Sequence, residues 1–209
     1  MATKTTKKRI LKAAAEEFSK RGYKATTVRR ICNRAQANVA AINYHYGSKE
    51  ELYVATHEFV FADSPLTRLA EKPLEVHNSK DWENTLHEFV YGLLSVITGP
   101  KDKDRWQSLL FMSERSHPSK VLPKLMEKIF LPLKDRIDTL IKMALPENAP
   151  EDELVLWRMS TISQCTVYAR RDPPWDKYLF PKKMDREKWL KTAARHVTES
   201  VTSRLSYRG

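Results

Sequence analysis

The sequence is poor in the residues that mark several classes of protein. Among 209 residues there are two cysteines, Cys32 and Cys165, and five glycines. Two cysteines make no disulfide framework, and no Cys/His cluster has the spacing of a metal site, so we expect a reduced protein without a metal or other cofactor. No apolar run is long enough to span a bilayer, and the N-terminus has no apolar signal core. We therefore expect a cytoplasmic protein that does not enter a membrane.

Acidic residues are scarce in the first quarter of the chain. Residues 1–50 hold 12 Lys/Arg and 3 Asp/Glu, a net charge of +9, whereas the remaining 159 residues hold 25 and 23, a net charge of +2. Basic charge concentrated in one segment is typical of a module that binds a polyanion such as DNA. Strand-like alternation is also hard to find, and apolar residues recur at helical spacing, so the sequence predicts an all-α fold.

Residues 26–53 carry the pattern of a helix-turn-helix, a motif whose second helix enters the major groove of DNA. Two short helices are predicted, at 27–35 and 39–46, because small polar residues stand where each would begin. Thr27 is the expected N-cap of the first helix, and Asn38 is that of the second.

The end of the second short helix is also marked in the sequence. Ile42 and Tyr46 are four residues apart and can share its inward face, and Gly47 can end it. Ser48 and Glu51 then have the spacing of a capping box, in which each side chain bonds the backbone N–H of the other residue. A third helix is therefore expected to start at Ser48.

Three further features of the helices are marked by a glycine, an aspartate and a proline. Gly22 should end the first helix of the chain. Asp81 should cap a helix that runs to about residue 98. A long helical stretch is predicted over 119–145, with a kink at Pro132.

Two strings of residues give this segment a more specific character: Ala-Ala-Glu-Glu-Phe-Ser-Lys-Arg-Gly-Tyr before the motif and Tyr-His-Tyr-Gly-Ser-Lys-Glu-Glu-Leu at its end. With them, the region from Lys8 to Tyr53 resembles the DNA-binding domain of the TetR family of transcriptional regulators. Gln36 departs from the family, which usually has glycine in this turn; if the turn needs positive φ, glutamine costs about 1 kcal/mol. The strings Phe-Met-Ser-Glu-Arg-Ser-His-Pro-Ser and Tyr-Ala-Arg-Arg-Asp, within residues 109–180, more weakly resemble the CecR (YbiH) subgroup.

The resemblance and the side-chain chemistry together suggest a DNA-binding surface. Hydroxyl, imidazole and ammonium groups near a helix N-terminus suit phosphate oxygens, which favours Thr27, Tyr44, His45 and Lys49. Tyr44 and His45 would otherwise be ordinary surface residues. In the family, the residue aligned with Arg29 and the early residues of the second helix face the groove. The residues expected to read bases are Arg29, Asn38, Val39, Ala40, Ala41 and Asn43.

Arg30 and Arg34 are equally well explained as solvated helix charges. We therefore leave them outside the predicted DNA-binding surface.

The rest of the chain is predicted to form a second helical domain, so that residues 1–50 bind DNA and residues 51–209 bind an effector and dimerise. The resemblance implies a small, mostly apolar effector held between helices and a homodimer formed through the last two helices, at about 151–171 and 185–206. Large apolar residues that could line the effector site, although most of them are equally well explained as core, are Phe89, Leu93, Trp106, Leu110, Phe111, Met126, Phe130, Trp157 and Tyr168.

The function implied is a sequence-specific regulator that binds operator DNA, represses transcription and is released by its effector. The alternative is a DNA-binding architectural protein or an activator without a small-molecule inducer. An enzyme is disfavoured because no catalytic constellation and no Gly-rich phosphate loop is present.

Overall fold

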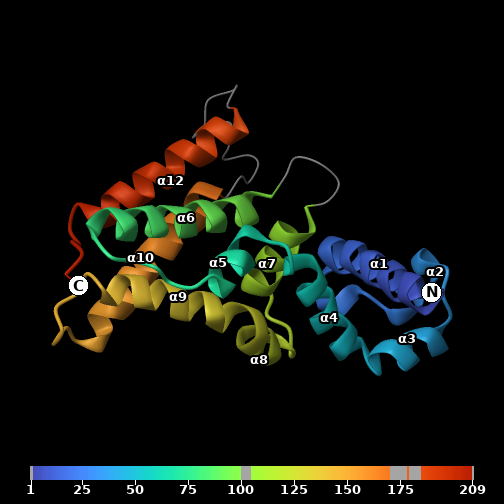
Figure 1. Ribbon diagram of the computed structural model, residues 1–209. Helices are drawn as coiled ribbons and strands as arrows, with labels where there is room; N and C mark the ends of the chain where they lie inside the picture. Colours follow the sequence, from blue (N-terminus) through green and yellow to red (C-terminus); the bar gives the residue numbers. More distant parts are fainter. Residues whose placement is uncertain (1, 100–104, 170–177, 179–184, 209) are drawn as a thin grey trace. The chain divides into compact units, whose positions relative to one another are not determined.

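The computed structural model describes residues 2–99, 105–169, 178 and 185–208, which are mainly helical (Figure 1). No strand occurs among these residues, which confirms the predicted all-α fold. In chain order the elements are α1 (Ala2–Ala25), α2 (Val28–Ala35), α3 (Val39–Tyr46), α4 (Lys49–Phe61), α5 (Pro65–Glu71), α6 (Ser79–Thr98), α7 (Trp106–Ser116), α8 (Leu122–Leu125), the π-helical turn η1 (Met126–Phe130), α9 (Leu131–Lys142), α10 (Glu151–Ala169) and α12 (Arg186–Thr202).

The chain folds into two compact units. The first unit comprises Met1–Ser64 and Gly99–Leu131, and the second comprises Pro65–Thr98 and Pro132–Gly209. The first unit is therefore larger than the DNA-binding segment 1–50 expected from the sequence, because α4, α7, α8 and η1 pack with α1–α3. The boundary expected at residue 50 separates a DNA-binding segment from an effector-binding segment, whereas the two units are defined by which helices pack together.

The starts of α2, α3 and α4 agree with the sequence prediction. The side chains of Thr27, Asn38 and Ser48 accept hydrogen bonds from the backbone N–H groups three residues later, so all three are N-caps. Gly22 kinks α1 with φ 71° and ψ 175°, values that a residue with a Cβ rarely adopts, but it does not end the helix as expected, because helical structure resumes and α1 continues to Ala25.

Half of the predicted capping box at the start of α4 is absent. The Glu51 N–H donates to the Ser48 hydroxyl at 3.1 Å, as expected. The Ser48 N–H instead donates to the Tyr46 carbonyl at 2.8 Å, and the Glu51 carboxylate pairs with Lys124. Glu51 pairs with Lys124, which is 73 residues away in the sequence, and the local capping-box pattern could not predict this partner.

Two other helix predictions were wrong in detail. The cap of α6 is Asn78, whose side chain accepts from the Asp81 N–H at 3.0 Å, so Asp81 lies in the first turn. The stretch 119–145 is divided into α8, η1 and α9 rather than being one kinked helix. Pro132 is the second residue of α9 and has no N–H to continue the α-helical pattern, and the π-helical turn lies directly before it.

The core of the first unit is built around α1 and α4. Phe18, Ile31, Ile42, Leu52 and Leu110 are fully buried there. Burial of such side chains contributes about 1.5–3 kcal/mol each, so this core, and not the short helices by themselves, stabilises the helix-turn-helix.

A buried hydrogen-bond network joins α4 to α7. The Tyr53 hydroxyl donates to the Glu114 carboxylate at 2.7 Å, and the same carboxylate accepts from the Ser119 N–H at 3.1 Å. Burial raises the pKa of Tyr53, and hydrogen bonding to Glu114 raises it further. The hydroxyl therefore stays protonated and keeps donating at physiological pH.

Three exposed ion pairs join the segment 120–128 to α4. They are Lys120–Glu50, Lys124–Glu51 and Lys128–Glu58. The hydrogen bond from Lys120 is the main reason that the pKa of Glu50 falls to about 2. Exposed pairs of this kind contribute about 0–1 kcal/mol each, less than the buried network.

In the second unit, α6 packs against α5, α10 and α12. The Trp82 indole N–H donates to the Leu140 carbonyl at 2.7 Å, which fixes α6 to α9. The apolar stripe of α12, including Val197 and Val201, is buried within the protomer. Charge placed at either valine would therefore disturb folding before it could test dimerisation.

His57 is fully buried in the first unit and is only half satisfied. Its Nδ1 lies 3.0 Å from the Tyr53 carbonyl, and its Nε2 has no partner among the described residues. Burial lowers the pKa of this imidazole, with smaller opposing effects from the Tyr53 carbonyl and Glu114. The folded protein consequently holds His57 neutral at a pH where the unfolded chain takes up a proton.

The free energy of unfolding should therefore decrease as the pH is lowered, before the pH reaches the range in which the carboxylates titrate. Because the folded pKa of His57 is lowered, its contribution is fully present above the unfolded pKa of about 6.5 and is lost below it, by up to about 1.4 kcal/mol per pH unit. His57→Phe should flatten urea-unfolding free energies between pH 6.5 and 5, whereas His117→Phe, at an exposed site, should not. Glu17, whose pKa is lowered from 4.5, loses stabilising charge only below this window. An unchanged slope in His57→Phe would contradict the assignment.

Candidate nucleic-acid interface

The turn between α2 and α3 contains a strained residue. Gln36 has φ 48° and ψ 46°, and it is the only residue other than glycine with positive φ in the described part of the chain. Its carbonyl accepts a hydrogen bond from Arg9 Nη2 at 3.2 Å, and the Ala37 N–H donates to the Cys32 carbonyl at 3.0 Å. The condition considered from the sequence is therefore met: this turn has positive φ, and glutamine there costs about 1 kcal/mol.

Helix α3 has one buried side and one exposed side. Ile42 and Tyr46 are buried, as predicted, and the Tyr46 hydroxyl donates to the Lys7 carbonyl at 3.1 Å. Val39 is 47% exposed and Tyr44 is 81% exposed, although both are large apolar or aromatic residues.

The other residues around α3 that are predicted to read bases also lie on its exposed side or at its edge. Asn38, Ala40 and Asn43 are exposed, whereas Ala41 is half-buried. Asn38 also accepts from the Ala41 N–H at 2.7 Å, so one side-chain oxygen is used for capping while its amide NH2 is left to donate.

The predicted phosphate-binding residues lie around the ends of α2 and α3. Thr27 is exposed at the start of α2, and Tyr44 and His45 lie in the last turn of α3, with their rings in edge contact. His45 is half-buried.

Lys49 is held at the first residue of α4 by an aromatic ring. Its Nζ lies 4.4 Å from the centroid of the Tyr23 ring, and the Tyr23 hydroxyl donates to Glu50 at 2.9 Å. Burial is the main cause that lowers the pKa of Lys49; Lys120 adds to this and Glu50 opposes it. The ammonium is thereby fixed close to the end of α3.

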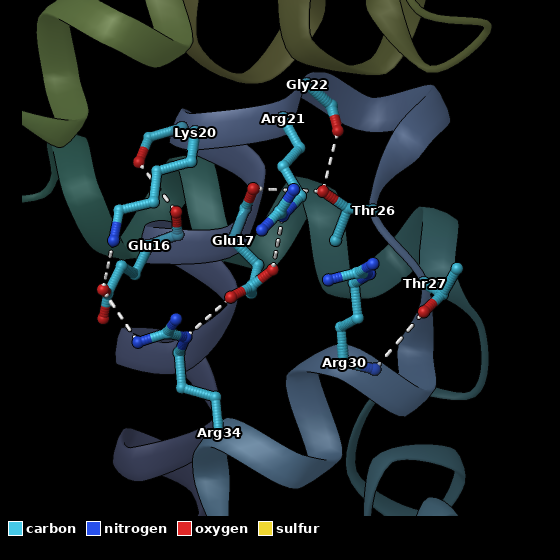
Figure 2. A network of polar contacts seen from close by, with 10 residues as sticks. Glu16, Glu17, Lys20, Arg21, Gly22, Thr26, Thr27, Arg30 and Arg34 are labelled. Carbon is cyan, nitrogen blue, oxygen red and sulfur yellow. Dashed lines mark hydrogen bonds and ion pairs between the residues drawn. The ribbon is translucent and has the colours of Figure 1, made fainter.

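An ion-pair network fixes α2 against α1 (Figure 2). Arg34 lies 2.7 Å from Glu17 and 2.8 Å from Glu16, and Arg21 lies 3.2 Å from Glu17. Burial would raise the pKa of Glu17, but hydrogen bonds from Arg34 and Arg21 outweigh it and keep the pKa below the ordinary value. Arg34 is therefore a structural residue.

Arg29 and Arg30 differ from Arg34 in this respect. Both are exposed on α2, and neither side chain has an ion pair or hydrogen bond with the described residues. Their guanidinium groups are consequently available to a ligand. Sequence reasoning missed the role of Glu17, although a carboxylate next to Phe18 on the buried stripe of α1 was a signal for it.

The residues proposed to line an effector site are divided between the two units. Trp106, Leu110, Phe111, Met126 and Phe130 belong to the first unit, whereas Phe89, Leu93, Trp157 and Tyr168 belong to the second. Phe111 and Phe130 contact each other at a ring-centroid distance of 5.8 Å. Leu110, Phe89 and Leu93 are buried core residues, and Met126 is exposed.

The comparisons with known proteins now identify the family. Residues 10–56 match the bacterial regulatory proteins of the tetR family. Residues 82–203, more than half of the chain, match the C-terminal domain of the HTH-type transcriptional dual regulator CecR. The chain belongs to the TetR family.

Two relatives share sequence with about a quarter of the chain. The dual regulator CecR from Shigella flexneri is 44% identical over 54 residues, which is 26% of this chain and 24% of that protein. The repressor NicS from Pseudomonas putida is 39% identical over 57 residues, 27% of either protein. The chain thus matches about a quarter of the length of these relatives.

Solved structures share the whole fold at low identity. A transcriptional regulator from Rhodococcus sp. Rha1 has a TM-score of 0.66 at 16% identity, with 97% of this chain and 99% of that chain covered. FadR from Bacillus subtilis, in complex with stearoyl-CoA, has a TM-score of 0.64 at 16% identity, with 94% and 97% covered. SmeT, the repressor of a Stenotrophomonas maltophilia multidrug efflux pump, has a TM-score of 0.63 at 16% identity, with 100% and 94% covered.

Among the described residues, no helix is long and apolar enough to cross a membrane. The same part of the chain contains no group of three or more His, Cys, Asp or Glu side chains that could hold a metal ion.

Relief of the strain at Gln36 should stabilise the protein. Gln36→Gly should raise the free energy of unfolding by about 0.5–1 kcal/mol, because glycine adopts positive φ without steric cost and keeps the carbonyl bonded to Arg9. Ala37→Gly is the matched control at a neighbouring residue without positive φ, and should destabilise by a similar amount. Urea unfolding would measure both, and a loss of stability in Gln36→Gly would contradict the strain.

Proposed function

We propose that the protein is a sequence-specific DNA-binding regulator of transcription that acts as a homodimer. The observation that carries the proposal is the exposed side of α3, which is capped, anchored by a buried opposite side, and surrounded by the most basic segment of the chain. A rigid, exposed helix with small residues at its start suits close approach to base edges in the major groove.

Some residues of this surface would contact base edges, and others would contact phosphates. Arg29, Asn38 and Asn43 would donate to base edges, and the methyl groups of residues 39–41 would contact thymine methyls. Thr27, Tyr44, His45 and Lys49 would contact phosphates and thereby set the position of α3 on the duplex.

An apolar surface on α10 supports the dimer. Leu156 is 67% exposed, Met159 is 54% exposed and Val167 is 62% exposed. Positions 156, 159 and 167 share one side of a helix, since they are separated by three and eight residues. Exposure of so many large side chains on one helix is costly in water, so we place the contact between subunits here, with α12 beside it.

The regulatory part of the proposal is repression that is relieved by a small, mostly apolar effector. It rests on the family, on the repressors NicS and SmeT, and on FadR, which was solved with stearoyl-CoA. An effector that weakens operator binding must itself bind less tightly to the DNA-bound form, by the same factor. The dual regulator CecR supports one alternative, in which the protein also activates some promoters.

Substitution of Arg29 and Lys49 should separate base reading from phosphate binding. Arg29→Ala should cost about 1–3 kcal/mol on the preferred duplex and relax preference at particular base pairs. Lys49→Ala should weaken binding to all sequences alike and reduce the salt dependence, as a log–log slope, by about one. Fluorescence anisotropy with duplexes selected from a random pool would measure both. Lys142→Ala, in the second unit, is the control that should change neither.

One outcome would contradict the proposal that this surface binds DNA. If Arg29→Ala and Lys49→Ala bound selected and random duplexes as the unsubstituted protein does, then α2 and the start of α4 would not contact DNA.

Charge on the exposed side of α10 should dissociate the dimer without unfolding the protomer. Leu156→Glu combined with Met159→Glu should shift the protein to monomers in sedimentation velocity and weaken operator binding at least tenfold, because burial of two carboxylates in an apolar interface is costly. Asn148→Glu combined with Ser206→Glu, at exposed sites outside α10, is the charge-matched control. A folded Leu156/Met159 variant that remained dimeric would place the interface elsewhere.

A further inference from the structure

Two neighbouring hollows occur on the second unit, on the surface formed by α5, α6 and α12. The larger, about 510 Å3, is lined from α6 by His87, Glu88 and Tyr91 and from α12 by Lys191, Thr192 and Arg195. The smaller, about 280 Å3, lies between α5 and α6 and shares Glu88 and Tyr91 with the first. Because two residues line both, the hollows form one groove across α6. Its size is in the range of small-molecule sites.

The groove has cations on both sides. Arg68 of α5 and Lys72, the residue that follows α5, line one side, and Lys191 and Arg195 of α12 line the other. Lys191 is paired with Glu187 at 2.7 Å. Lys72 and Arg195 are exposed, and their side chains make no ion pair or hydrogen bond with the described residues. Each side of the groove therefore has a cation that is available to an anion.

The groove is lined by one carboxylate, that of Glu88, and its negative charge is partly balanced by a buried arginine. Glu88 has no hydrogen bond among the described residues, but it interacts electrostatically with Arg136 of α9, a buried guanidinium whose Nε has no partner among those residues. Burial lowers the pKa of Arg136, and Glu88 opposes that shift. The charge of Glu88 is thus partly balanced by Arg136, and the charges of Lys72 and Arg195 at the edges are not balanced by an ion pair with the described residues.

The middle of the groove can hold an apolar body. Tyr91 lines both hollows and is half-buried, so that one part of its ring faces the groove. The aliphatic stems of the lysines and arginines extend the apolar lining beside it. None of the exposed apolar residues of α10 that we assign to the dimer lines either hollow.

We propose that this groove is a binding site for a small organic monoanion, an aryl carboxylate, whose carboxylate pairs with Arg195 and whose ring lies against Tyr91. Guanidinium binds a carboxylate through two parallel hydrogen bonds, which favours this group over a halide or other simple anion. A polyanion is disfavoured because Glu88 stands at the centre. The site is separate from the DNA-binding surface and does not depend on the proposed repression.

The test uses the full-length protein without DNA, so that its result is independent of operator binding. The probe is 2-naphthoate, followed by its own fluorescence, and the uncharged comparison is 2-naphthalenemethanol. The unsubstituted protein should bind naphthoate at least tenfold more tightly than the alcohol. Arg195→Gln should weaken naphthoate binding about tenfold and leave the alcohol unchanged, since it removes one charge-assisted contact.

Two further variants sharpen the assignment. Arg204→Gln removes an exposed cation just beyond the end of α12 and outside both hollows, and should leave naphthoate binding unchanged. Glu88→Gln should tighten naphthoate binding a few-fold, because it removes the only acidic side chain of the groove. Circular dichroism would confirm that each variant is folded.

Three results would overturn the proposal. They are no binding of naphthoate at millimolar concentration, equal affinity for naphthoate and the alcohol, or equal losses in Arg195→Gln and Arg204→Gln. The first would show that the groove does not take small aryl carboxylates, and the third would show that only the overall charge of the protein matters.

Discussion

The arrangement of the helix-turn-helix depends on a buried carboxylate. Glu17 lies on the inward side of α1, where a lone charge would be costly, and it is stabilised because Arg34 of α2 and Arg21 of α1 both bind it. Glu17 is buried, but the side chains of Arg34 and Arg21 are 38% and 44% exposed, so solvent screens both pairs and each contributes nearer to the value of an exposed ion pair, about 0–1 kcal/mol, than to the value of a fully buried one. The orientation of α2, and through the short turn that of α3, is therefore tied to α1 by this contact and by the apolar core around Phe18.

Helix α3 belongs to a packed unit that includes α7, α8 and η1 as well as the helix-turn-helix. The Tyr53–Glu114 hydrogen bond is buried and involves a carboxylate, whereas the pairs made by Lys120, Lys124 and Lys128 are exposed. By magnitude the buried bond, at about 1.5–3 kcal/mol, outweighs any one of the exposed pairs. Within the first unit, this network links α7 to α4, the helix that directly follows α3 in the chain.

The second unit presents two surfaces of different chemistry. The exposed side of α10 is apolar and suits a second copy of the chain, while the groove across α6 is bordered by cations and suits a small anion. The contrast arises because α12 buries its own apolar stripe against α6 and α10 and leaves its basic residues outside. One packing arrangement thus produces both surfaces.

The sequence by itself determined the all-α fold, the N-caps of α2, α3 and α4 and the family, because caps, turn residues and helical periodicity act between neighbours in the chain. Only the tertiary structure decided which partner Glu51 takes, that Asn78 caps α6, that the 119–145 stretch contains a π-helical turn, and that the stripe of α12 faces inward. It also separated Arg34, which is bound by Glu17, from Arg29, which is left free. Most of these outcomes depend on contacts between residues distant in sequence, whose energies exceed the local preferences that a pattern can express.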